Sequence, residues 1–183
     1  MEDLSLHILD IVENSLAAGA TDIDITIREE IGKNRLTVII KDNGKGMDET
    51  MLEKVLDPFY TTKNTRRVGL GLSMLAQAAE EADGNCTISS EPGKGTTITA
   101  CFAHDHIDRK PLGNMAETIA ACLVSIGART NIRYCHHKND AVFVFDTKEI
   151  RKEINGVVLN TPQVVSVLKQ HIERGLEAIE KKE

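Results

Sequence analysis

The segment DIVENSLAAGAT at residues 10–21 carries polar side chains that can take part in phosphate chemistry. Asp10 and Asn14 are four residues apart, so in a helix they lie on one face, one turn from each other. An amide oxygen is a hard ligand that suits Mg²⁺, and a carboxylate one turn away can polarise a water molecule. An amphipathic helix with an ordinary polar face accounts for the same residues without any chemistry.

The segment DNGKGM at residues 42–47 follows an apolar run and contains two glycines. Gly44 and Gly46 let the backbone approach a flat ligand without obstruction from side chains. Asp42, at the end of the apolar run, can accept a hydrogen bond from an exocyclic amine such as that of adenine. The alternative is a plain turn between a strand and a helix, which also favours Asp, Asn and Gly.

The segment RRVGLGLSML at residues 66–75 places glycines where a loop enters a helix. Backbone N–H groups and the helix dipole can meet a phosphate chain at such a position. Lys63, Arg66 and Arg67 lie just upstream or within it and can neutralise phosphates. A flexible loop with a solvated cluster of charges has the same composition, so this segment by itself is weak evidence.

The segment EPGKGTTI at residues 91–98 is the last glycine-containing piece of this kind. Thr96 is expected to open a strand, where its hydroxyl can join the hydrogen-bond set of Asp42. A β-hairpin with a glycine turn is the simpler interpretation of the segment alone.

Hydrophobic periodicity predicts the elements that must position these residues. We expect helices over 4–19, 48–56 and 70–84, and strands over 21–28, 35–41, 85–90 and 96–102, with a loop over 57–68. The polar stretch at 103–114 is the predicted boundary between a domain of residues 1–103 and a module of residues 104–183. In that module we expect a helix over 115–126, a hairpin of strands 130–137 and 141–146, and a terminal helix capped by Thr161 with Pro162 at its first position.

Composition narrows the class of protein. The chain has 183 residues, of which 41% are hydrophobic and 27% charged, as in soluble globular proteins. A net charge of −6 argues against non-specific binding of nucleic acid. The four cysteines form no C-x-x-C pair, so a zinc or iron–sulfur site has little support. His136 and His137 would point to opposite faces of a strand, which makes them a poor metal clamp. With no leader or membrane-length apolar run, we expect a cytoplasmic protein with free thiols.

The order of these segments resembles the superfamily of gyrases, heat-shock chaperones, histidine kinases and mismatch-repair ATPases. DIVENSLAAGAT resembles the N box, DNGKGM the first glycine box, DPFYTTK the F box of histidine kinases, RRVGLGL the second glycine box, and GKGTT the last glycine motif. The resemblance covers about residues 4–103. It implies an α+β fold: a two-layer α/β sandwich of Bergerat type, with a mixed sheet and helices on one face, followed here by a small α+β module of unknown role.

The resemblance also implies roles for individual residues. Asn14 is the expected Mg²⁺ ligand, Asp42 the contact to the adenine amino group, and Asp10 the catalytic base. The remaining expected nucleotide contacts shape the base pocket or belong to the lid over the phosphates: Gly44, Gly46, Met47, Phe59, Lys63, Arg67, Gly69, Leu70, Gly71 and Thr96. Where many relatives carry Glu, this chain has the shorter Asp10, which puts its reach toward a water molecule in doubt.

Three functions are compatible with these residues. The favoured one is a stand-alone regulatory kinase or ATPase that binds ATP and Mg²⁺ and acts on a partner protein, as anti-sigma-factor kinases do. The alternative is a nucleotide-switched protein-binding module with little or no turnover, which the short Asp10 favours. A dimerising clamp like the mismatch-repair ATPases is the third, supported by the N box and opposed by the histidine-kinase F box. A homodimer is compatible with all three.

Overall fold

Alternating apolar residues build the central strand of the fold, as the sequence predicts. Ile23, Ile25 and Ile27 of β1 (Asp22–Glu30) are each at most 1% exposed, whereas the residues between them are less buried. The strand extends to Glu30, two residues beyond its predicted end, and a single 3₁₀ turn, η1 (Ile31–Lys33), follows it. Asn34 ends this turn in the left-handed conformation, with φ of 49°, and the chain reverses into β2 (Arg35–Asp42).

The computed structural model describes residues 3–55, 70–127, 129–154 and 158–181. Their further elements are α1 (Leu4–Ala17), α2 (Glu49–Val55), α3 (Leu70–Glu81), β3 (Asn85–Glu91), β4 (Gly95–Ala103), α4 (Met115–Ser125), β5 (Asn131–Lys138), β6 (Ala141–Asp146), α5 (Thr147–Glu153) and α6 (Pro162–Glu180). Among these described helices, none combines the length and apolar character that crossing a membrane requires.

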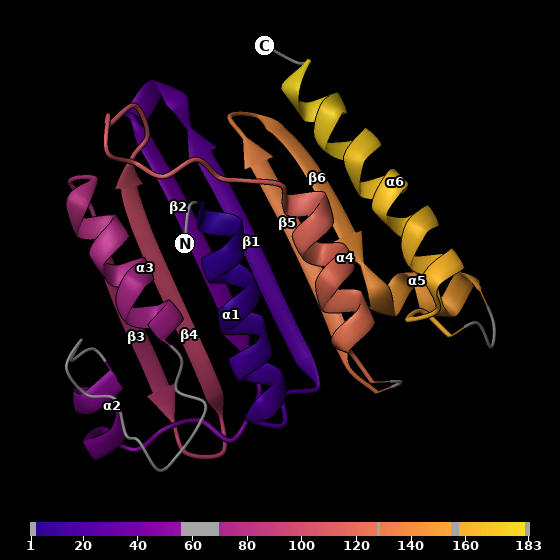
Figure 1. The fold of residues 1–183 in the computed structure, drawn as a ribbon, viewed down its shortest axis with the longest axis horizontal. Coiled ribbons are helices and arrows are strands. Elements are labelled where there is room, and N and C mark those ends of the chain that lie inside the picture. The colour runs from indigo at the N-terminus through magenta and orange to yellow at the C-terminus, as the bar shows by residue number, and fades with distance from the viewer. Residues whose placement is uncertain (1–2, 56–69, 128, 155–157, 182–183) are drawn as a thin grey trace.

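The sheet has six strands in the order β3-β4-β2-β1-β5-β6. Every neighbouring pair is antiparallel except β1 and β5, which run parallel with Ile25 opposite Tyr134. Helices α1, α3, α4 and α6 lie across one face of this sheet (Figure 1). The predicted class, a two-layer sandwich with a mixed sheet and helices on one face, is therefore confirmed.

The second half of the chain extends the sheet of the first half. The boundary predicted near residue 104 falls between β4 and α4, yet β5 pairs with β1 along its whole length. One hydrophobic core contains residues of both halves, for example Ile8 of α1 and Ile119 of α4. That residues 104–183 form a module with a role of its own stays a prediction.

Helix ends follow short-range hydrogen bonds. Asp3 caps α1, because its carboxylate accepts from the backbone N–H of Leu6, and Asp48 precedes α2 and accepts from the N–H of Met51 at 2.8 Å. Thr161 is at the N-cap position of α6 with Pro162 in the first turn, as predicted, but its hydroxyl donates to the carbonyl of Val158 and makes no cap hydrogen bond to the helix. Pro162 has no N–H, so one backbone donor fewer needs a partner at this end of the helix.

Candidate functional site

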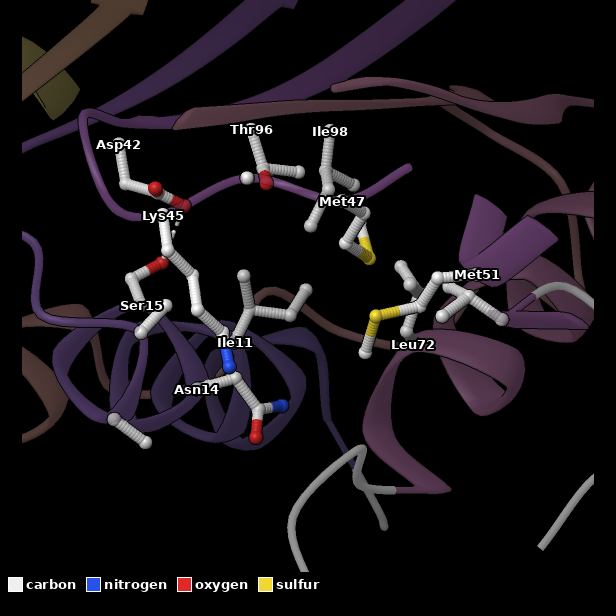
Figure 2. Close-up of a pocket in the computed structure, with 14 residues that line it drawn as sticks. Ile11, Asn14, Ser15, Asp42, Lys45, Met47, Met51, Leu72, Thr96 and Ile98 are labelled. Carbon is white, nitrogen blue, oxygen red and sulfur yellow. Dashed lines mark hydrogen bonds between the residues drawn. The ribbon is translucent and has the colours of Figure 1, made fainter. Parts of the chain in front are cut away.

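A cavity of about 360 Å³ lies between α1, the loop after β2, α2 and the start of α3. This is within the usual size range of small-molecule sites. Figure 2 shows that its side chains come from both layers of the fold, with Asp42, Thr96 and Ile98 on the sheet side and Ile11, Asn14 and Ser15 on the helix side. The lining residues are Ile11, Asn14, Ser15, Ala17, Ala18, Asp42, Lys45, Gly46, Met47, Met51, Val55, Leu72, Thr96 and Ile98.

Asp42 is the fixed carboxylate of this cavity. It is the last residue of β2 and is only 8% exposed. One carboxylate oxygen accepts from the Ser15 hydroxyl at 2.8 Å, and the other accepts from the Gly44 backbone N–H at 2.8 Å. A carboxylate oxygen has more than one lone pair, so each can still accept a further hydrogen bond from a ligand. The two bonds therefore orient the carboxylate and leave it able to accept further hydrogen bonds.

Thr96 stands directly opposite Asp42 in the register of β2 and β4. Its hydroxyl forms a hydrogen bond with the Ser90 hydroxyl at 2.9 Å, not with Asp42, so the predicted direct link between the two is not made. The Ser90 oxygen also accepts from the Met47 N–H at 2.9 Å. Ser90 thus connects Thr96 to the loop that carries Met47, and neither of these two hydrogen bonds involves the Asp42 carboxylate.

The loop after β2 is held close to its surroundings on both sides. The Lys45 N–H donates to the carbonyl of Ala18 at 3.0 Å, and the Lys45 carbonyl accepts from the N–H of Gly93 at 2.7 Å. Gly46 has a φ of +65°, and a Cβ there would lie 2.0 Å from the carbonyl oxygen of Glu91. A side chain at position 46 would therefore push the loop off the β3–β4 turn.

Asp10 lies one turn before Asn14 on α1, as predicted, but only Asn14 lines the cavity. The Oδ2 atom of Asp10 is buried and has no hydrogen-bond partner among the residues that the structure describes. A Cβ built at Gly71, in the first turn of α3, would lie 1.9 Å from that oxygen. The first turn of α3 therefore packs directly on the carboxylate predicted to act as the base.

His7 lies one turn further back and is fully buried. Burial lowers the pKa of its ring, and the positive charge of Lys110 lowers it further, while the backbone of Gly71 and the charge of Asp10 act in the opposite direction. A pKa below the ordinary value of 6.5 makes the imidazole neutral at pH 7.

The predicted site residues separate into three groups. Asn14, Asp42, Gly46, Met47 and Thr96 line the one cavity, and Gly44 adjoins it through its bond to Asp42. Asp10 and Gly71 contact each other beside it. The others lie outside the described residues, apart from Leu70, whose backbone begins α3 and whose side chain is not described: Phe59, Lys63, Arg67 and Gly69.

Sequence reasoning missed three contributions to this site. Ser15 fell into the apolar stripe of α1, although a polar residue in such a stripe signals a buried hydrogen bond. Lys45 has no sequence signal beyond its place between two glycines, yet Figure 2 shows its side chain extending from the loop toward Asn14. The apolar walls formed by Met51 and Ile98 had no signal beyond their place in predicted elements.

Comparison with known proteins identifies a family over the first part of the chain. Residues 2–106 match the family model described as histidine kinase-, DNA gyrase B-, and HSP90-like ATPase. A putative sensor protein of Shewanella frigidimarina is 36% identical over 104 residues, which are 56% of this chain and 16% of that protein. Sporulation kinase E of Bacillus subtilis is 39% identical over 77 residues, 42% of this chain and 10% of that protein.

A third relative is also similar over only a small part of its own length. The tetrathionate sensor histidine kinase TtrS of Salmonella typhimurium is 30% identical over 100 residues, 52% of this chain and 16% of that protein. The chain thus matches no more than 16% of the length of these three relatives.

A solved structure is similar over a longer stretch. The N-terminal domain of a DNA repair protein superposes with a TM-score of 0.53 at 16% sequence identity, covering 79% of this chain and 52% of that chain. At this identity the likeness concerns the fold alone. Because the family model matches more than half of the residues, the chain belongs to the family of histidine kinase-, DNA gyrase B- and HSP90-like ATPases.

Proposed function

We propose that this chain binds ATP with Mg²⁺ in the cavity beside Asp42 and works as a regulatory kinase or ATPase on a partner protein. The observation that carries the proposal is the Asp42 carboxylate, held by Ser15 and Gly44 on the wall of a largely apolar cavity. A carboxylate fixed in this way suits an exocyclic amine, because each of its oxygens has a further lone pair that can accept a hydrogen bond from a ligand.

The rest of the cavity supports a purine nucleotide. Met47, Met51 and Ile98 offer apolar surface for the two faces of a planar base. Asn14 faces the cavity from α1, where its amide oxygen can hold Mg²⁺, and Lys45 adds a positive charge on the same side. When bound, Mg²⁺ neutralises phosphate charge, which is a main requirement of phosphoryl transfer.

Asp10 is the proposed base for the reaction. Its place one helical turn from Asn14 puts it on the side of α1 where the phosphates would lie. A carboxylate there can accept a proton from a water molecule or from the hydroxyl of an acceptor. It needs an arrangement in which it is not confined by Gly71, so movement of the first turn of α3 is part of the proposal.

The same contact favours a second candidate function. Because Gly71 packs on the Oδ2 atom of Asp10, turnover can be slow, and the chain would then be a nucleotide-switched protein-binding module. In that case, ATP changes the position of α3 and thereby a surface for a partner, with little hydrolysis.

Incubation with γ-labelled ATP, with and without cell extract, separates the two candidates. Label on a protein supports a kinase, free phosphate alone supports an ATPase, and tight binding with neither supports the switch. The matched variant Asp10→Asn keeps the size of the side chain and should abolish turnover while it spares ATP binding. Equal turnover in that variant would remove Asp10 from the mechanism.

A further inference from the structure

Two of the described residues that line the cavity carry a charge, Asp42 and Lys45. Asp42 ends β2 and is only 8% exposed, whereas Lys45 lies on the loop three residues later and is exposed. Figure 2 shows the Lys45 side chain extending from this loop across the cavity toward Asn14 on α1. The cavity therefore has a negative group fixed at the sheet and a positive group that reaches toward the helix.

The backbone of Lys45 is held on both sides. Its N–H donates to the carbonyl of Ala18 at 3.0 Å, and its carbonyl accepts from the N–H of Gly93 at 2.7 Å. The preceding residue, Gly44, also lies close to α1, because a Cβ there would be 3.0 Å from the Cβ of Ala18. Since the main chain is already fixed, the entropic cost of ordering this residue on a ligand is confined to its flexible side chain.

The positive charge of Lys45 is not taken up by the protein around the cavity. Within the described part of the chain, no hydrogen bond or ion pair involves its ammonium group. Asp42, the other charged residue of the lining, uses its two oxygens to accept from Ser15 and from the N–H of Gly44. The two charges of the cavity therefore do not neutralise each other, and the positive one can meet an anionic group of a ligand.

We propose that Lys45 binds the phosphate chain of the nucleotide: its ammonium contacts phosphate oxygens at the helix side of the cavity while Asp42 holds the base at the sheet side. The inference rests on the proposed function, because it assigns a ligand group to one more residue of the same cavity. The loop after β2 then recognises the phosphates directly, so that phosphate binding does not depend on Mg²⁺ at Asn14 alone.

Charge favours this orientation of the nucleotide over the reverse one. A phosphate chain beside the carboxylate of Asp42 would place like charges together, which is unfavourable in a cavity with apolar walls. The same chain beside Lys45 meets the positive charge of the described lining. An ammonium binds phosphate as a point charge on a flexible stem, so it does not need the fixed geometry of a guanidinium. Lys45 and a Mg²⁺ ion at Asn14 share the phosphate charge, and the lysine contributes most when the metal is absent.

The test compares two variants of Lys45 with a matched control. Lys45→Met removes the ammonium and keeps an unbranched side chain, and Lys45→Arg keeps the positive charge. Lys41→Met makes the same change on β2, at an exposed lysine that does not line the cavity. Calorimetry measures the affinity of each variant and of the parent chain for adenosine, for ATP with Mg²⁺, and for ATP with a chelator.

We expect Lys45→Met to lower the affinity for ATP with Mg²⁺ by about tenfold, as for the loss of one charged hydrogen bond, and to leave the affinity for adenosine within about twofold of the parent. With a chelator, the loss should grow to about 30-fold, because no metal then shares the phosphate charge. Raising the salt concentration from about 0.05 to 0.5 M should reduce the loss, since salt screens exposed charges. Lys45→Arg should stay within about threefold of the parent, and Lys41→Met should bind every ligand as the parent does.

The comparison of adenosine with ATP makes the result specific to the phosphates. Unchanged affinity for ATP in Lys45→Met would overturn the inference, and so would an equal loss for adenosine and ATP, which would point to a change in the loop. A loss in Lys45→Arg as large as in Lys45→Met would also overturn it, because the charge would then not be the cause. A parent chain that binds neither adenosine nor ATP would instead contradict the proposed function.

Discussion

The contact between Gly71 and Asp10 predicts an unusual response to a glycine-to-alanine change in a helix. In the absence of contacts, alanine stabilises a helix by up to about 1 kcal/mol relative to glycine. At position 71, however, the new Cβ would lie 1.9 Å from Oδ2 and 2.6 Å from Cγ of Asp10, which forces the Asp10 side chain or one of the two helices to shift. Overpacking of this kind costs about 1–3 kcal/mol.

We therefore expect Gly71→Ala to lower the free energy of unfolding by about 1–2 kcal/mol, with the overpacking cost exceeding the helix gain. For a chain of this size, that corresponds to a fall in Tm of about 3–6 °C. Urea unfolding followed by circular dichroism measures the change, provided that the slope with denaturant is the same for both proteins.

A double-mutant cycle assigns the effect to Asp10. In an Asp10→Ala background, the carboxylate is gone and only the Cβ of residue 10, at 2.9 Å, remains close. The cost of Gly71→Ala should then fall by about 1–2 kcal/mol, which is the coupling expected for residues in contact. As a control, Gly32→Ala meets nothing within 4 Å and should change stability by no more than about 0.5 kcal/mol. If Gly71→Ala were as stable as the parent, or equally costly in both backgrounds, the packing argument would be wrong.

Two further substitutions test other parts of the structure. Burial raises the pKa of Glu29, but hydrogen bonds from His136 and His104 outweigh it and bring the pKa to about 2. A carboxyl whose pKa is lower in the folded than in the unfolded protein stabilises the fold at pH values above its unfolded pKa, so Glu29→Gln should lower the free energy of unfolding by on the order of 2 kcal/mol at pH 7. In urea unfolding experiments, this difference from the parent should shrink between pH 4.5 and 2. A difference that is constant with pH would contradict the prediction. Gly46→Ala should lower ATP affinity by about tenfold or more in calorimetry, because the residue has a positive φ and its Cβ would meet the Glu91 carbonyl at 2.0 Å; unchanged affinity would show that the loop does not shape the site.

Local sequence signals were sufficient for much of the fold. The spacing of Leu4, Ile8 and Ile11 predicted α1, and the same spacing placed Asp10 and Asn14 on one polar face. These signals work because a helix or strand repeats within the segment that forms it. The glycine turn after β2 was predictable for the same reason, since its backbone conformation depends on neighbours in sequence.

Pairings between distant segments were not predictable. The sequence contains no signal that β5 lies parallel to β1, because strand partners are chosen by the packing of the whole core. The bond between Ser15 and Asp42 joins residues 27 positions apart, and the approach of Gly71 to Asp10 depends on how two helices cross. Residues of the candidate site could therefore be named from the sequence. The contacts that hold them in place, such as those of Ser15 and Gly71, could be seen only in the structure.

Calorimetric titration of ATP with Mg²⁺ into the parent chain and into Asp42→Asn tests the nucleotide site most directly. The amide keeps the shape of the side chain but removes the charge and one acceptor, so we expect affinity to fall by about 10- to 150-fold, equivalent to 1.5–3 kcal/mol for a hydrogen bond to a charged group. Asp24→Asn, the same change on β1 opposite Lys41 and outside the cavity lining, should leave affinity unchanged. No heat from ATP binding to the parent chain, or equal affinities for the parent and Asp42→Asn, would contradict the assignment of this cavity to the nucleotide.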